Sequence, residues 1–143
     1  SRCGCNSIAV QMLHQNWDRY FDSASANGQY LQICHSRGAV DVANALASYD
    51  PERRKRIQVI AVAPGKYIDP DTCGTVRHYR NDSFWRDPVP RLDFIGARKY
   101  ASTIVDVKSH PNARWIDHGI QSPTYKPLLA RDLENFYASG RIG

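Results

Sequence analysis

Three side chains of types that can cooperate in nucleophilic chemistry occur in this sequence, at Ser36, Asp87 and His118. Ser36 lies in the stretch C-H-S-R-G at residues 34–38, where a short apolar strand pattern runs directly into a helix pattern. That layout is typical of a nucleophile elbow, usually written G-x-S-x-G, in which a sharp turn exposes the serine hydroxyl. Small residues at both ends of the stretch are expected to let strand and helix approach. The alternative is a serine that merely caps the following helix.

A serine hydroxyl is a weak nucleophile at neutral pH and needs an adjacent base. We expect His118 to take the proton of Ser36 and to return it to the leaving group, while Asp87 fixes the imidazole tautomer. His110 in the same predicted loop is the alternative base. His118 is preferred because it lies nearer the last predicted helix, where the histidine loop of an α/β-hydrolase ends. His35 is expected to point away from its neighbour and to pack beside the strands.

The acid and the oxyanion donors are less closely defined by the sequence. Asp87 follows the third predicted strand, and the competing carboxylates are those of Asp82, Asp93 and, as a solvent-facing strand residue, Asp106. The backbone N–H of Arg37 is expected to be one oxyanion donor. The second should come from a loop after an earlier strand.

No earlier strand is predicted, because an apolar helix pattern at residues 5–22 directly precedes the elbow strand at 29–34. We therefore expect either that the earlier strands belong to a part of the protein outside this sequence or that the oxyanion hole is incomplete. Since losing one donor costs about 10²–10³ in rate in other hydrolases, a slow enzyme is expected in the second case.

Hydrophobic periodicity predicts alternating helices and strands, with residues 91–100 left ambiguous. The predicted strands are 29–34, 56–64, 75–80 and 101–107, and the predicted helices are 5–22, 37–49 and 125–139. The run at 56–64 is nearly all apolar, as in a parallel strand buried on both faces. We predict an α/β fold with a mostly parallel sheet and flanking helices, in the form of a partial or truncated α/β-hydrolase. The chain order Ser, Asp, His agrees with that fold.

Composition indicates one domain over residues 1–143 and excludes a membrane span, since no apolar run approaches about 20 residues. The net charge of +5 owes much to the cluster at residues 53–56, which is expected to be a solvated helix end. A nucleic-acid or anionic-membrane patch is the alternative, although no aromatic residues interleave with these charges, and nucleic acid ranks last among possible partners. The spacing of Cys3, Cys5, Cys34 and Cys73 fits no zinc site, so no metal is expected, and no cofactor is expected either. Four reduced thiols are expected, and the alternative is a disulfide from Cys3 or Cys5 to Cys73.

Several stretches together carry a resemblance to a known family. They are residues 33–39, the arginine-rich turn before Ile57, and residues 62–64, 67–68, 78–81, 86–90, 109–111, 117–118 and 122–125. In these the chain resembles a family of uncharacterised chlamydial proteins with a lipase-like, α/β-hydrolase-type core, although Gln is expected where this chain has Arg37. The resemblance implies a C-terminal piece of a longer chain, since relatives carry a hydrophobic N-terminal segment.

Two classes of function follow from the sequence. The first is a serine hydrolase of esters or lipids that uses Ser36. The second is a catalytically inactive hydrolase-like module that binds a protein partner. The expected location is a soluble domain in a reducing environment, within a membrane-tethered or secreted bacterial protein.

Overall fold

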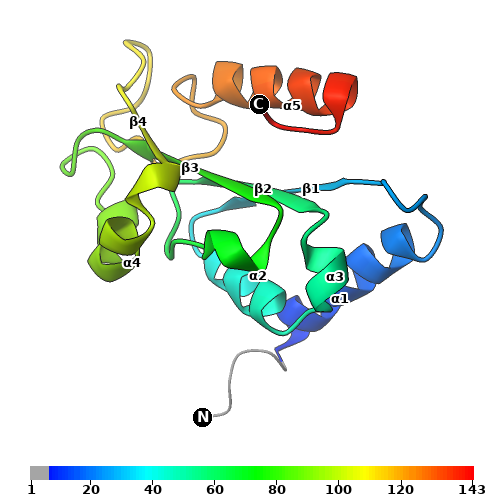
Figure 1. Ribbon diagram of the computed structural model, residues 1–143. Helices are drawn as coiled ribbons and strands as arrows, with labels where there is room; N and C mark the ends of the chain where they lie inside the picture. The colour runs from blue at the N-terminus through cyan, green and yellow to red at the C-terminus, as the bar shows by residue number, and fades with distance from the viewer. Residues whose placement is uncertain (1–6) are drawn as a thin grey trace.

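The computed structural model describes residues 7–143, which form a four-stranded sheet with helices on both faces (Figure 1). The strands are β1 (Tyr30–His35), β2 (Ile57–Val62), β3 (Thr75–Asn81) and β4 (Ile104–Val107). They pair in the order β1-β2-β3-β4, and every pairing is parallel. This arrangement confirms the predicted α/β class, with the carboxyl ends of all four strands at one edge of the sheet.

The helices cover the sheet unequally. Figure 1 shows α1 (Ile8–Phe21), α2 (Gly38–Ala47) and the short α3 (Pro51–Arg54) on one face, and α5 (Lys126–Ser139) on the other. The ambiguous segment contains α4 (Phe94–Lys99), which lies near β4. Each face has its own apolar core, because alternate residues of the central strands point to opposite sides.

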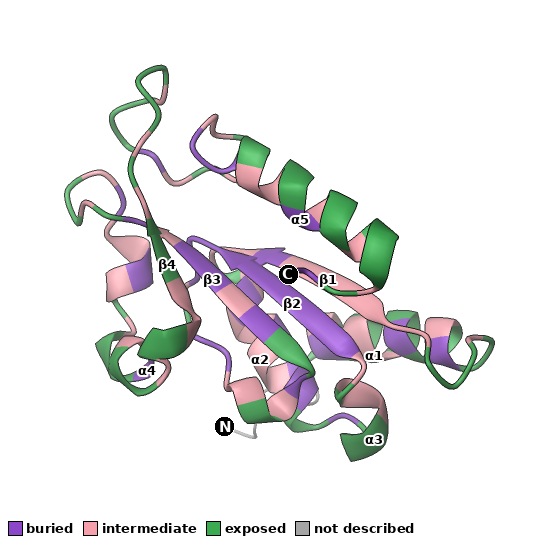
Figure 2. Ribbon diagram, turned by 45° about the horizontal axis from the view of Figure 1, so that its top comes forward, coloured by how far each residue is buried: buried purple, intermediate pink, exposed green. Residues whose placement is uncertain are grey.

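Strand β2 is the centre of both cores. All six of its residues are buried, and Figure 2 shows it as the most continuously buried strand of the sheet. Val59 and Ala61 pack toward α1 and α2, whereas Ile60 and Val62 pack toward α5. The prediction of a strand buried on both faces is therefore confirmed, and this strand holds the neighbouring end of β1 in place.

Helical spacing in the first predicted helix indicates one apolar stripe, and the structure confirms it only in part. The stripe consists of Ile8, Met12, Leu13, Trp17, Tyr20 and Phe21. The side chains of Val10, Trp17 and Phe21 are buried, but those of Ile8 and Met12 are exposed. The helix packs on α2 and β1 through a face rotated from the predicted one. Trp17 also donates its indole N–H to Gln32 Oε1 at 3.0 Å, which orients that face toward the sheet.

The basic cluster at residues 53–56 is not simply a solvated helix end. Arg53 forms ion pairs with Asp18 at 3.1 Å and Asp22 at 2.9 Å, both at the end of α1. Arg56 donates to two backbone carbonyls of the loop before β1. These contacts join three segments of the chain, so the cluster acts mainly as a structural clamp. Within residues 7–143, no helix is both long and apolar enough to cross a bilayer.

Candidate functional site

Ser36 occupies a strained turn between β1 and α2, at the carboxyl edge of the sheet. Its φ of 54° is one of two positive values among the described non-glycine residues, and such a conformation costs about 1–3 kcal/mol. Two backbone bonds to the neighbouring strand end hold it: Ser36 N donates to Val62 O at 3.1 Å, and Gly65 N donates to Ser36 O at 2.8 Å. The helix cap is Arg37, so the interpretation of Ser36 as a plain N-cap is wrong.

The expected reason for Gly38 is not seen. A Cβ added at Gly38 would meet no heavy atom within 4 Å, so the strand and helix do not crowd this position. Cys34, at the other end of the stretch, is buried, and its burial raises the pKa of the thiol to about 12. The turn is therefore held against the end of β2 by its backbone hydrogen bonds, whereas the space next to Gly38 on the side of α2 is free.

The structure brings Ser36, His118 and Asp87 into one hydrogen-bonded chain. Ser36 Oγ lies 2.7 Å from His118 Nε2, and His118 Nδ1 lies 2.9 Å from Asp87 Oδ1. Because an ionised carboxylate only accepts, Nδ1 carries the proton and Nε2 accepts from the serine hydroxyl. This is the tautomer that a general base for serine requires.

The carboxylate of Asp87 is fully buried, and it is incompletely paired. Its Oδ1 accepts from His118 and, at 3.2 Å, from the backbone N–H of Val89, whereas no donor within residues 7–143 reaches Oδ2. Burial raises the pKa of Asp87 above its usual range, against the opposing effect of the hydrogen bond from His118. The side chain is thus held ready to stabilise a positive charge on the imidazole.

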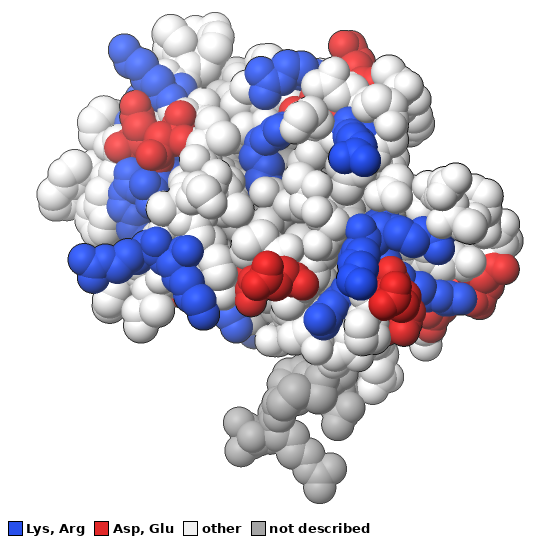
Figure 3. All heavy atoms as spheres, in the orientation of Figure 1, with Lys and Arg blue, Asp and Glu red and all other residues white. Residues whose placement is uncertain are grey.

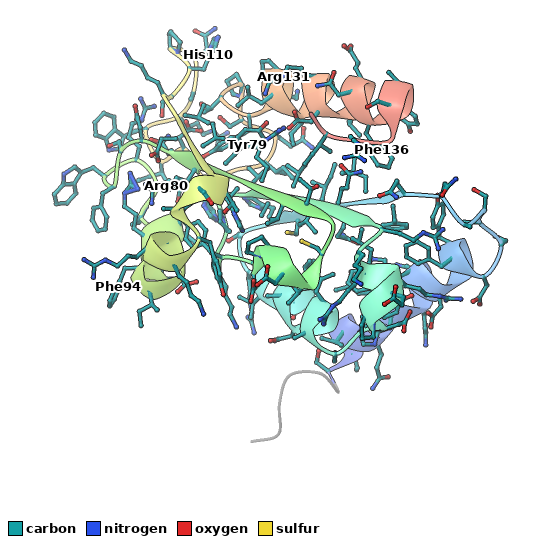
Figure 4. All side chains as sticks on the ribbon, in the orientation of Figure 1. Tyr79, Arg80, Phe94, His110, Arg131 and Phe136 are labelled. Atoms are coloured by element: carbon teal, nitrogen blue, oxygen red, sulfur yellow. The ribbon has the colours of Figure 1, made fainter. Side chains whose placement is uncertain are left out.

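The competing residues take other positions. Asp93 caps α4 by accepting from Gly96 N at 3.0 Å, and Asp106 pairs with Arg80 on the surface. Asp82 is exposed. His110 is exposed too and accepts from a backbone N–H of its own loop at 3.0 Å, and Figure 4 shows it at the outer end of that loop. Of the two histidines expected as base, it is His118 that forms a hydrogen bond with the serine.

His35 is not bonded to the serine, in line with the expectation that it is not the base, but it contacts His118 and does more than pack beside the strands. Its Nε2 lies 2.5 Å from the backbone carbonyl of His118, and the two rings lie 4.8 Å apart, centroid to centroid. Since a carbonyl only accepts, His35 donates the proton. The residue before the nucleophile therefore holds the backbone of the residue that contacts the nucleophile. The only available sequence signal was its position at the carboxyl end of β1.

A second buried carboxylate fixes the loop on which His118 lies. Asp117 is 2% exposed and accepts hydrogen bonds at 2.5–3.0 Å. Its donors are Ser122 Oγ, Thr124 Oγ1, Ser109 Oγ and Asn81 Nδ2. Burial alone would raise the pKa of Asp117, but the three hydroxyl bonds outweigh it and hold the pKa below its usual range. Sequence reasoning missed this cluster, whose members come from separated segments.

The loop that carries His118 borders a hollow, and the residue expected to give an oxyanion donor directly follows the serine. A hollow of about 500 Å³ lies against His118 and is lined by the loop of residues 112–123. The backbone N–H of Arg37 follows the serine directly, at the start of α2. The free edge of β1 pairs with no other strand of the described chain, and so the loop expected to bring a second donor is not found there.

Among residues 7–143, no group of three or more His, Cys, Asp or Glu side chains could hold a metal ion. Cys34 and Cys73 are free thiols, and the pKa of the Cys73 thiol is also raised by burial, to about 12. The alternative of a disulfide from Cys3 or Cys5 to Cys73 involves positions 3 and 5, which lie outside the described residues. The described site therefore offers serine, imidazole and carboxylate chemistry.

Comparison with known proteins adds no relative. No family model, no curated protein and no solved structure matches this chain. The resemblance to a chlamydial family stays a prediction, and the site is interpreted from its own geometry.

Proposed function

We propose that the protein is a serine hydrolase that acts on carboxylic esters, with Ser36 as its nucleophile. One observation carries the proposal: an unbroken chain of hydrogen bonds runs from Ser36 Oγ through His118 to Asp87. The strained backbone of Ser36 supports it, because strain of this kind concentrates at functional sites.

The reaction follows from the two hydrogen bonds. Ser36 Oγ forms a bond to the acyl carbon while its proton passes to His118 Nε2, and Asp87 stabilises the resulting imidazolium. The oxygen of the tetrahedral intermediate accepts from the N–H of Arg37. When the bond to the leaving alkoxide breaks, His118 returns the proton to it. A water molecule then gives its proton to His118 Nε2 and attacks the acyl carbon. The bond from that carbon to Ser36 Oγ breaks, His118 returns the proton to Ser36 Oγ, and the acid product leaves.

The expected turnover is slow. Within residues 7–143 the expected oxyanion donor is the N–H of Arg37 alone, and a missing second donor corresponds to a loss of about 10²–10³ in rate. The hydrolase proposal thus requires an assay that detects a weak but specific serine reaction.

Labelling with a serine-directed fluorophosphonate, followed by mass spectrometry, tests the proposal together with hydrolysis of p-nitrophenyl acetate. We expect slow labelling of Ser36 and ester turnover that both disappear in Ser36→Ala and in His118→Ala. The matched control is Ser139→Ala, which removes an exposed serine of α5 and should change neither signal. Labelling equal in the unchanged protein and in Ser36→Ala would contradict the proposal.

The second candidate is an inactive hydrolase-like module that binds a protein partner. The outer edge of β1 favours it, since no strand within residues 7–143 pairs with that edge and an edge strand offers backbone donors and acceptors to another chain. The same labelling experiment separates the two. A protein with the native urea-unfolding profile and no labelling at all would favour the binding module.

A further inference from the structure

Each of the two loops of the candidate triad carries an exposed apolar pair just before its polar residue. Phe84 and Trp85, 47% and 76% exposed, precede Asp87, and Trp115 and Ile116, 70% and 60% exposed, precede His118. We call these four side chains the apolar lip. Since Asp87 is hydrogen-bonded to His118, and His118 to Ser36, the lip belongs to the two loops that position the base beside the serine.

The lip is held in place by bonds between the two loops. Arg86 donates to the carbonyls of Trp115 at 3.0 Å and Arg114 at 2.8 Å, and its guanidinium lies 5.2 Å from the centroid of the Trp115 ring. In return, Asp117 N donates to the Arg86 carbonyl at 2.7 Å. Phe84 and Trp85 also pack edge to face. These hydrogen bonds and ring contacts between the two loops hold the aromatic rings in exposed positions. Exposed apolar patches of this kind mark interaction sites.

Positive charge accompanies the lip. Arg86 and Arg114 are direct sequence neighbours of the lip residues. The carboxylates of Asp87 and Asp117 in the same loops are buried, and Asp82 is exposed. Further along the chain, exposed apolar residues just before and at the start of α4 are followed by exposed cationic residues at its end. These are Leu92, Phe94 and Ile95, and then Arg98 and Lys99. Figure 3 shows blue side chains gathered on the side of the molecule where α4 lies.

From this arrangement we infer that the lip docks on the surface of an anionic lipid assembly and that Ser36 acts on ester lipids presented there. The substrate part of the inference rests on the proposed hydrolase function, and the docking part does not. Tryptophan suits such an interface because its ring is apolar and its N–H is polar. Arginine and lysine near an anionic lipid surface add electrostatic attraction.

Co-sedimentation with vesicles tests the docking, and Ser36→Ala is used so that no lipid is consumed. One set of vesicles is pure phosphatidylcholine, and the other has equal parts phosphatidylcholine and phosphatidylglycerol. We expect binding to the anionic vesicles, and at least about tenfold weaker binding after Trp85→Ala and Trp115→Ala are added together. Tyr137→Ala is the matched control, since Tyr137 is 86% exposed on α5 and outside both loops.

Tryptophan emission gives a second readout. Trp17 is fully buried, so a blue shift on vesicle addition, or quenching by lipids brominated in their chains, comes from Trp85 or Trp115. Equal binding by the double variant, or no binding to anionic vesicles, overturns the inference. Loss of self-association in the double variant without vesicle binding also overturns it and assigns the lip to a second copy of this chain.

The substrate part is tested on the unchanged protein, with fatty acid release from the anionic vesicles compared with turnover of p-nitrophenyl acetate. Release that needs Ser36 supports the inference. Turnover of the soluble ester without any release from bound vesicles refutes the substrate part alone. Vesicle binding without either turnover refutes the hydrolase proposal and leaves the docking inference intact.

Discussion

Asp87 and Asp117 are two buried carboxylates, one hydrogen-bonded to the imidazole of His118 and the other on the residue before it in the sequence. They differ in how many hydrogen-bond donors surround them. Asp117 accepts four hydrogen bonds from side chains, three of them from hydroxyl groups. Asp87 has an oxygen without a partner in the described part of the chain, and its other oxygen holds His118. Burial raises the pKa of Asp87, whereas hydrogen bonds lower that of Asp117.

The difference separates two uses of a buried charge. A carboxylate whose donors are all neutral and fixed has its charge stabilised in the resting fold, and it holds a loop in place. A carboxylate with too few donors has a poorly stabilised charge. That charge is stabilised most when a neighbouring group becomes positive, as an imidazole does when it accepts the proton of serine. Asp87 is thus suited to catalysis and Asp117 to structure, and each of the following substitutions tests that division.

Asp87→Asn should give the largest effect, in rate rather than stability. An amide in place of the carboxylate no longer stabilises an imidazolium, so the rate constant for ester turnover should fall by about 10⁴. The free energy of unfolding should change by less than about 1 kcal/mol, because the substitution also removes a buried, incompletely paired charge. Steady-state turnover and urea unfolding measure the two quantities. Asp82→Asn, in the same loop and exposed, is the control and should change neither.

Asp117→Asn should show the reverse pattern. The amide nitrogen replaces one of the oxygens that accept the four bonds and faces donors such as Asn81 Nδ2. A loss of about 3 kcal/mol in the free energy of unfolding is expected, with a smaller loss of turnover than for Asp87→Asn. Urea unfolding at neutral pH is the measurement. A greater destabilisation by Asp87→Asn than by Asp117→Asn would reverse the comparison.

Among the histidines, His78 is used for structure as Asp117 is among the carboxylates. Its two nitrogens have partners inside the fold, one accepting from Ile68 N at 2.9 Å and one bonded to Thr103 Oγ1 at 2.7 Å. Burial lowers the pKa of His78 to about 4, against the opposing effect of Thr103. The unfolded chain binds a proton near pH 6.5 that the folded chain excludes. Stability is therefore present above that pH and is lost as the pH falls toward 4, by about 2 kcal/mol between pH 7 and 5.

Urea unfolding at several pH values measures this loss, and His78→Gln should remove that part of the slope. Each variant is compared with its own stability at pH 7, so that a general destabilisation by the substitution does not matter. An unchanged slope in His78→Gln would assign the acid sensitivity to other groups.

His35→Phe should give the smallest effect. The ring contact with His118 is kept, but the proton donated to the His118 carbonyl is lost. We expect about a tenfold lower kcat, equivalent to about 1.4 kcal/mol, with an unchanged KM for a soluble ester. His35→Gln, which restores a donor, should recover part of kcat. Equal kcat in the Phe variant and the unchanged protein would show that Asp87 and Asp117 alone position the base.

The sequence predicted the parts of this molecule that depend on local pattern. The apolar run of β2 predicted a buried strand, and the small residues around Ser36 predicted a turn between strand and helix. The contact between His35 and His118 was missed because the partner of His35 is a backbone carbonyl 83 residues away, whose position depends on the path of a long loop. The environment of Asp117 has the same origin.

The helix α4 could not be predicted because its start depends on tertiary contacts. Asp93 caps it and also accepts from Tyr67 N at 2.9 Å, a bond that no local pattern reveals. A six-residue helix is too short for periodicity to be informative. Predictable elements therefore position the serine, and the less predictable loops position its partners.

The bond between Ser36 and His118 joins residues 82 positions apart, and the three strands β2, β3 and β4 lie between them along the chain. Loop closure over such a distance is slow and occurs only when the intervening pairings are complete. On refolding from denaturant, recovery of serine reactivity should therefore lag behind the fluorescence change of Trp17, which reports packing between α1 and β1. The hydrogen bond between Ser36 and His118 is therefore expected to be among the last contacts to form, after the strands of the sheet have paired.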